Sequence, residues 1–236
     1  MTAGPARLFS IFAKDADPYL VREWILLVAW VYATYLFFTE GESFFGAIVG
    51  GFTFPLLIYG AVAAGLIGHS LESGQFGHIW TLPISREGSL ALRVAGYVAP
   101  TAGLLVLPLV FLGLWASLPP SLAGTLPAFA LMSTTLTLYV TFGGLVAATT
   151  RNALASSVLV FLPFLILPGY ASLAFPHNLL LQGTLGSLRV LVPSAQIPAV
   201  SLVGLAEIAL VQLVASSLLF AITYWTLRRS NLRSGR

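Results

Sequence analysis

The stretch FFGAIVGGFTFPLLIYGAVAAGLI, residues 44–67, decides the fold because it contains no charged side chain. A helix needs about 20 apolar residues to cross the hydrocarbon core of a bilayer, and this stretch is long enough to do so. The rest of the chain is similar: of 236 residues, 58% are hydrophobic and 8% are charged, and the mean hydropathy is +0.93. Soluble domains carry about 25% charged residues. The excess apolar surface must therefore face lipid, and the chain is predicted to be a polytopic membrane protein.

Length and hydropathy together predict six membrane-spanning segments, at residues 19–39, 44–67, 94–118, 126–149, 153–173 and 202–227. In the first segment the purely apolar part starts at Trp24, so Arg22 and Glu23 are expected at the lipid headgroups. The apolar runs are continuous rather than alternating, which favours helices over the strands of a barrel. No segment has the composition of a separate soluble module. Residues 1–236 are therefore predicted to form a single all-α membrane domain.

The basic residues predict the orientation of the chain in the cytoplasmic membrane. With the N-terminus inside, ten of the 11 basic residues fall on cytosolic segments: Arg7, Lys14, Arg22, Arg86, Arg93, Arg151, Arg228, Arg229, Arg233 and Arg236. Only Arg189 falls outside, which is the asymmetry that the positive-inside rule describes. Both termini are therefore predicted to be cytosolic. The net charge of +3 fits attraction to the anionic lipids of the inner leaflet, and no nucleic-acid partner is needed to explain it.

The connection between the second and third segments, about residues 69–90, contains the densest polar and aromatic stretch of the chain, ESGQFGHIWTLPISRE at residues 72–87. Read as a helix, it places on one face Phe76, Ile79, Trp80 and Pro83. Such a helix is too short and too polar to cross the membrane, so it is expected along the cytosolic interface. Its aromatic face either rests among the lipid headgroups or inserts into a groove of a cytosolic partner. Periodicity alone favours the lipid interpretation.

The sequence of this stretch resembles the loop between the second and third spans of type-2 ATP-binding-cassette permeases. In that family a glutamate is followed by a glycine, an apolar helix and a Pro-x-Ser-Arg ending. The matching residues here are Glu72, Gly74, residues 76–82, Pro83, Ser85 and Arg86. The layout is also similar: a basic N-terminal elbow at about residues 5–22 precedes six spans, and an outer loop at about 174–201 has the composition of short outer helices.

In that family the loop is a coupling helix that docks onto the ATPase subunit. The resemblance therefore implies that Phe76, Ile79 and Trp80 form the docking face of this chain. It implies that Glu72 and Arg86 make flanking polar contacts, within a motif completed by Gly74, Pro83 and Ser85. Many relatives have a Gly-Thr pair where this chain has Gly74 and Gln75.

The chain lacks the G-x-x-x-x-G-K-[ST] loop that holds ATP phosphates, and its only lysine is Lys14. We therefore expect no enzyme activity and no cofactor on this chain, with ATP and Mg bound by a separate cytosolic ATPase subunit. The resemblance also implies a second permease copy, as a homodimer or heterodimer. The three histidines, at positions 69, 78 and 177, have no spacing typical of a zinc site.

Two further groups of residues are candidates for packing or for a substrate path. Small-xxx-small spacing allows close helix approach, within one chain or between chains, at Gly46/Gly50, Ala61/Gly65 and Ala64/Gly68. One face of the fourth predicted segment holds Thr134, Thr137 and Thr141. Such a face is suited either to lining a polar path or to hydrogen bonds with the carbonyl groups of its own helix. The only charge well inside a predicted segment is Glu207, which makes it a functional candidate, although outer headgroups or Arg189 are within its expected reach.

The resemblance as a whole implies the membrane-spanning permease subunit of an ATP-driven transporter, an exporter, with an unidentified cargo. A secondary transporter or channel is the first alternative, but it predicts ionisable residues near the midplane and often an internal repeat. Neither feature is visible in the sequence. A membrane anchor for a cytosolic complex is the second alternative, and it stays open because a docking helix serves both purposes.

Overall fold

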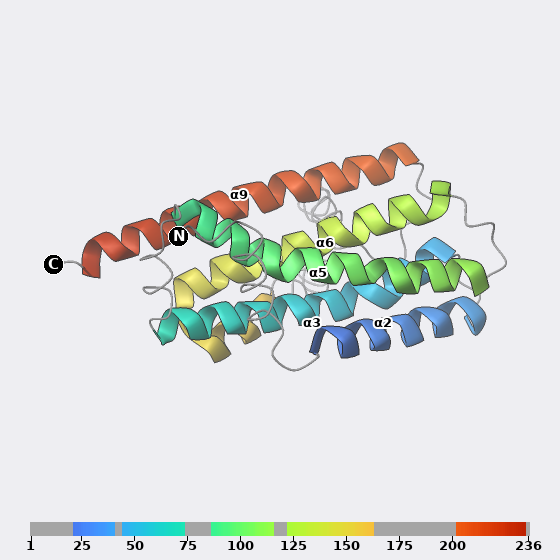
Figure 1. Cartoon of the computed structure of the whole chain (residues 1–236), viewed down its shortest axis with the longest axis horizontal. Coiled ribbons are helices and arrows are strands. Elements are labelled where there is room, and N and C mark those ends of the chain that lie inside the picture. Colours follow the sequence, from blue (N-terminus) through green and yellow to red (C-terminus); the bar gives the residue numbers. More distant parts are fainter. Residues whose placement is uncertain (1–20, 41–43, 74–85, 116–121, 163–201, 235–236) are drawn as a thin grey trace, which may run out of the picture.

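The structure is a computed structural model that describes residues 21–40, 44–73, 86–115, 122–162 and 202–234. The regular structure in these residues consists of α2 (Val21–Phe38), α3 (Phe44–Glu72), α5 (Arg86–Trp115), α6 (Leu122–Thr150), a shorter helix at Ala153–Leu162, and α9 (Leu202–Ser234) (Figure 1). Within these ranges no strand is present. The prediction of an all-α chain is confirmed for this part of the molecule.

Among the described residues, four helices are long and apolar enough to cross a membrane, through the segments Gly51–Glu72, Leu90–Leu107, Phe129–Thr150 and Ala209–Arg229. They belong to α3, α5, α6 and α9, and they correspond to the second, third, fourth and sixth predicted segments. The first predicted segment coincides with α2, and the fifth begins with Ala153–Leu162, but neither is among the four. Residues 163–173, most of the predicted elbow and the outer loop at 174–201 lie outside the described residues.

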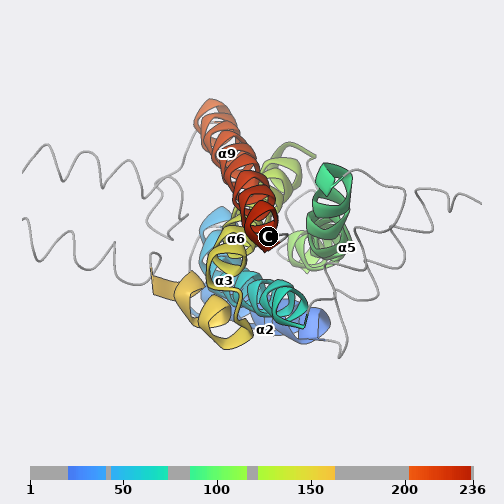
Figure 2. The same cartoon turned by 90° about the vertical axis from the view of Figure 1, so that its left-hand side faces the viewer.

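The helices form a row, with one helix to its side. α3 contacts α2 and α6, α6 also contacts α9, and α5 packs mainly against α6. Seen along the bundle, the row runs from α2 through α3 and α6 to α9 (Figure 2). α3, α6 and α9 run in one direction, and α2 and α5 run in the other (Figure 1). The ends of α3, α6 and α9 therefore lie toward the same end of the bundle as the start of α5.

That shared end carries most of the basic residues that the structure describes. Arg86 and Arg93 lie near the start of α5, Arg151 follows α6, and Arg228 and Arg229 lie near the end of α9. We call it the basic end. It is the end that the positive-inside rule assigns to the cytosol.

α2 carries two charged residues, Arg22 and Glu23, at its start. It begins beside the middle of α3 (Figure 1), so Arg22 and Glu23 lie along the side of the bundle rather than at its basic end. Their side chains form an ion pair with each other. Pairing reduces the cost of bringing two charges close to apolar surroundings.

α3 and α6 approach each other closely because glycines lie at their interface. A Cβ atom on Gly60 would lie 2.8 Å from Cβ of Tyr139, and one on Gly143 would lie 2.9 Å from the carbonyl oxygen of Gly60. Real Cβ contacts are not this short, so only glycine permits the observed helix separation. Ala64 lies against Gly143 in the same interface. Small residues at helix contacts are typical of membrane bundles.

The predicted small-xxx-small pairs therefore serve packing within the chain at the positions that the structure describes. Gly65 faces Ser157, and Gly68 faces Ser156 and Asn152, so this part of α3 packs against the start of Ala153–Leu162. The packing of Gly46 and Gly50 lies outside the described residues.

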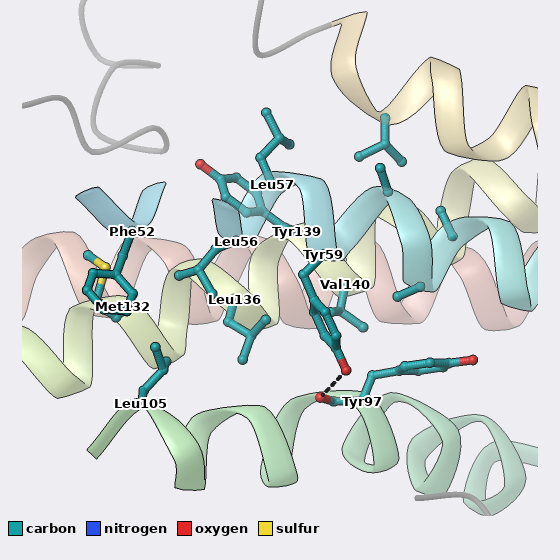
Figure 3. Close-up of a cluster of buried hydrophobic side chains, with 14 of the residues drawn as sticks. Phe52, Leu56, Leu57, Tyr59, Tyr97, Leu105, Met132, Leu136, Tyr139 and Val140 are labelled. Carbon is teal, nitrogen blue, oxygen red and sulfur yellow. Dashed lines mark hydrogen bonds between the residues drawn. The ribbon is translucent and has the colours of Figure 1, made fainter. Parts of the chain in front are cut away.

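Large apolar side chains fill the space between α3, α5 and α6. The cluster contains Phe52, Leu56, Leu105, Met132, Leu136 and Val140 (Figure 3). At one side of it, the Tyr59 hydroxyl donates a hydrogen bond to the carbonyl oxygen of Tyr97 at 3.2 Å (Figure 3). This bond joins α3 to α5.

The outer helices expose apolar rather than polar surface. In α3, 67% of Gly51–Glu72 is buried, whereas in α9 only 22% of Ala209–Arg229 is buried. The exposed large apolar side chains of α9 are Leu210, Val211, Leu213, Val214, Leu218, Ile222 and Trp225. Between residues 209 and 229, where the structure describes the side chains of α9, the buried ones are mostly polar: Gln212, Ser216 and Thr223, together with Leu227. A helix with its apolar side outward is suited to lipid and not to water.

Candidate functional site

The structure describes the two ends of the predicted docking segment. Glu72 is the last residue of α3 and Arg86 is the first residue of α5, so the segment joins these helices at the basic end. The other predicted docking residues lie outside the described residues: Gly74, Phe76, Ile79, Trp80, Pro83 and Ser85. Glu72 is exposed, and its Oε2 accepts a hydrogen bond from the backbone N–H of Ala153 at 3.4 Å.

A buried arginine ties α3 to α5 close to this segment. Arg93 is only 6% exposed, and its Nη2 donates a hydrogen bond to Oγ of Ser70 at 2.6 Å. Ser70 is 4% exposed, and its hydroxyl also bonds the Leu66 carbonyl oxygen at 2.9 Å. Hydrogen bonds to a charged group are stronger than those between neutral groups. The last turns of α3 and the first turns of α5 are therefore held together.

Arg93 was counted in the sequence only as a cytosolic basic residue, and its buried position was missed. The available signal was its setting, since Arg93 lies inside the apolar run LALRVAGY, residues 90–97. An arginine surrounded by apolar neighbours on its own helix needs a polar group from another helix. No pattern in the sequence identifies Ser70 as that group.

The three threonines predicted to share a face of α6 have different partners. Thr137 donates to the Ser133 carbonyl oxygen at 2.7 Å, and Thr141 donates to the Thr137 carbonyl oxygen at 2.8 Å. These bonds stay within α6, as threonine hydroxyls in helices often do. Thr134 bonds the Leu131 carbonyl oxygen at 3.0 Å and also reaches across to α9.

The partner of Thr134 on α9 is Gln212, which sequence reasoning missed. The Thr134 hydroxyl donates to Oε1 of Gln212 at 2.5 Å, and Nε2 of Gln212 donates to the Thr135 hydroxyl at 3.1 Å. Gln212 and Thr135 are fully buried. The signal for Gln212 was a lone amide within the apolar run ALVQLVA, residues 209–215.

Thr134, Thr135 and Gln212 form a polar cluster in which the side chains bond one another. Its geometry is that of a helix-to-helix contact, which polar side chains commonly make in membrane bundles. Glu207 lies on α9, one to two turns before Gln212, and the surroundings of its side chain lie outside the described residues. The structure thus brings Thr134 to α9 but does not bring Thr134, Thr137 and Thr141 to one partner.

No family model, curated protein or solved structure matches the chain. Within the described ranges, no group of three or more His, Asp or Glu side chains is placed to hold a metal ion. The residues themselves, above all those at the basic end, therefore carry the information about function.

Proposed function

We propose that this chain is the membrane-spanning permease subunit of an ATP-binding-cassette transporter, acting as an exporter in the cytoplasmic membrane. In this proposal a separate cytosolic subunit binds and hydrolyses ATP, and six spans of this chain pair with a second permease copy. The observation that carries the proposal is the Glu72–Arg86 motif and its position. The motif joins two helices of membrane-spanning length at the end of the bundle where the arginines gather.

The mechanism requires that a displacement of the docking segment by the ATPase subunits is transmitted to the spans. ATP binding closes the two ATPase subunits on each other, and the segment at residues 76–82 passes this motion to α3 and α5. The Arg93–Ser70 bond supports such transmission, because it makes the adjoining turns of the two helices move together. The close contact of α3 with α6 at Gly60 and Gly143 carries the motion further into the bundle.

Pairing with a second copy is supported by the apolar outer surface. α2 and α9, at opposite ends of the row, expose large side chains such as Tyr32 and Leu218. In a membrane such surface faces either lipid or another apolar helix. The direction of transport comes from the family resemblance alone.

The first test is to recover the motor subunit. The full chain carries an affinity tag in the cells that make it, the complex is extracted from membranes, and its proteins are identified by mass spectrometry. We expect an ATPase with a nucleotide-binding loop to co-purify. Trp80→Ala should lower its recovery by about tenfold or more, because buried aromatic residues contribute much of the binding energy of an interface. Trp24, which is 64% exposed on α2, provides the control, and Trp24→Ala should leave recovery unchanged.

The complex is then reconstituted into vesicles and its ATPase activity is measured with candidate cargo compounds. A permease subunit predicts that a transported compound stimulates ATP hydrolysis. An anchor predicts binding of the cytosolic protein without stimulation. Transport by the purified chain alone would contradict the proposal and favour the secondary-transporter alternative.

A further inference from the structure

A two-residue turn at the basic end joins α6 to the helix Ala153–Leu162. Both turn residues, Arg151 and Asn152, are exposed. Arg151 has φ of 51°, in the left-handed region that glycine and asparagine adopt at lower cost than arginine. Its backbone N–H donates to the Ala147 carbonyl oxygen at 2.9 Å, which ends α6. Glycine is the usual residue at such a helix end. Backbone geometry alone therefore does not explain an arginine here.

The turn is held in place by its own residues. Oδ1 of Asn152 accepts a hydrogen bond from the backbone N–H of Ala155 at 2.9 Å, which caps the following helix. The hydroxyls of Thr150 and Ser156 are 2.8 Å apart, and Ser156 also donates to the Asn152 carbonyl oxygen at 2.6 Å. These bonds connect the last residue of α6 to the first turn of the next helix.

The turn is also held by α3. Gly68 lies so close that a Cβ atom there would be 2.9 Å from the Asn152 carbonyl oxygen. Glu72 accepts the backbone N–H of Ala153 at 3.4 Å, and a carboxylate is favourable at a helix N-terminus. The turn is thus fixed to the end of α3, next to the point where the docking segment leaves that helix.

This fixed turn presents an exposed cation. Within the described part of the chain, the Arg151 guanidinium makes no hydrogen bond or ion pair. The exposed Glu72 carboxylate lies at the same turn, so a positive and a negative group face outward together. A fixed backbone lowers the conformational entropy that is lost when the side chain it carries binds a partner.

We propose that the Arg151 turn is a second contact for the ATPase subunit, in which the Arg151 guanidinium binds a carboxylate on that subunit. This inference rests on the proposed function. The planar guanidinium suits a two-pronged bond to a carboxylate. Contact at this turn links the motor to α6 and to the Ala153–Leu162 helix, in addition to α3 and α5.

A protein surface fits this turn better than an anionic lipid headgroup does. Headgroups attract any basic side chain near the membrane and require no fixed backbone geometry. The neighbouring Glu72 carboxylate repels an anionic headgroup, whereas a protein partner can match both charges. The bonds that end α6 and cap the next helix also fix the point at which the Arg151 side chain leaves the turn.

Substitutions at Arg151 can separate the side chain from the backbone. Arg151→Gly and Arg151→Asn suit the left-handed conformation and remove the charge, so both variants should melt at the same or a higher temperature than the wild type. Arg151→Lys keeps the charge. The probe is the purified ATPase subunit that co-purifies with the wild-type chain, and its Kd is measured on the full chain in nanodiscs.

We expect Arg151→Gly and Arg151→Asn to raise the Kd by about two- to fivefold, and fivefold is the upper end for loss of an exposed ion pair. Arg151→Lys should fall between these variants and the wild type. Added salt should weaken wild-type binding more than binding by the uncharged variants, because it screens the lost pair. A Kd within about twofold of the wild type for both uncharged variants would overturn the proposal, because the Arg151 charge would then contribute too little to count as a contact.

The lipid alternative has its own outcome. Binding is measured in nanodiscs of phosphatidylcholine with and without phosphatidylglycerol. If the loss of affinity occurs only with phosphatidylglycerol present, Arg151 binds anionic lipid headgroups and the proposal is wrong. If no ATPase binds the wild-type chain at all, the proposed function itself fails. Wild-type binding with unaffected Arg151 variants defeats only the second contact.

Discussion

At the scale of single residues, Gln212 offers the clearest measure of what a buried polar group contributes in this bundle. Gln212→Leu removes the amide that joins α9 to α6 while keeping a similar volume. Thr134 keeps its bond to the Leu131 carbonyl oxygen, so one of its two partners remains. In bilayers such interhelical hydrogen bonds average about 0.6 kcal/mol. We therefore expect the free energy of unfolding, measured by denaturant titration in micelles, to fall by about 0.6–2 kcal/mol.

The matched control is Thr137→Val, because the Thr137 hydroxyl bonds only the Ser133 carbonyl oxygen of its own helix. Removing it leaves the α6–α9 contact intact, and the free energy of unfolding should change by less than about 0.5 kcal/mol. Equal effects of the two substitutions would show that Gln212 does not hold the helices together.

At the scale of helices, the separation of α3 and α6 depends on glycine. Gly60→Ala would place its Cβ 2.8 Å from Cβ of Tyr139 and 3.2 Å from its backbone carbon. A backbone neighbour cannot rotate away, so the helices must move apart. Overpacking of this kind costs about 1–3 kcal/mol. The loss should appear as a lower free energy of unfolding for the full chain in micelles.

Gly103 in α5 is the control for the same substitution. A Cβ there would meet nothing within 4 Å, so Gly103→Ala adds no clash. It instead gains helix propensity, with stabilisation of up to about 1 kcal/mol. The two variants should therefore shift stability in opposite directions. A stabilising Gly60→Ala would mean that α3 and α6 are not in close contact.

At the scale of the whole molecule, the apolar runs were enough to predict where the long helices are. The hydropathy signal was less informative about their ends: α3 continues to Glu72 rather than stopping at residue 67, and α5 begins at Arg86 rather than at residue 94. Backbone hydrogen bonds extend a helix through polar residues that no longer look like a membrane span. Contacts such as the hydrogen bond of Arg93 with Ser70 join residues on different helices. The spacing of apolar and polar residues along a single helix therefore does not reveal them.

The orientation of the bundle decides which end a cytosolic motor can reach, and it can be measured directly. The chain contains no cysteine, so single cysteines can be introduced into an otherwise unreactive background. Ser73 follows α3 at the basic end, and Thr39 follows α2 at the opposite end; both are exposed. A maleimide that does not cross membranes should label Thr39→Cys in intact cells. It should label Ser73→Cys only after the membrane is permeabilised, because the positive-inside rule predicts that the arginine-rich end lies in the cytosol. The reverse pattern would place the docking segment and Arg151 outside the cell, where no ATP-driven subunit is available, and would exclude the proposed function and the second contact together.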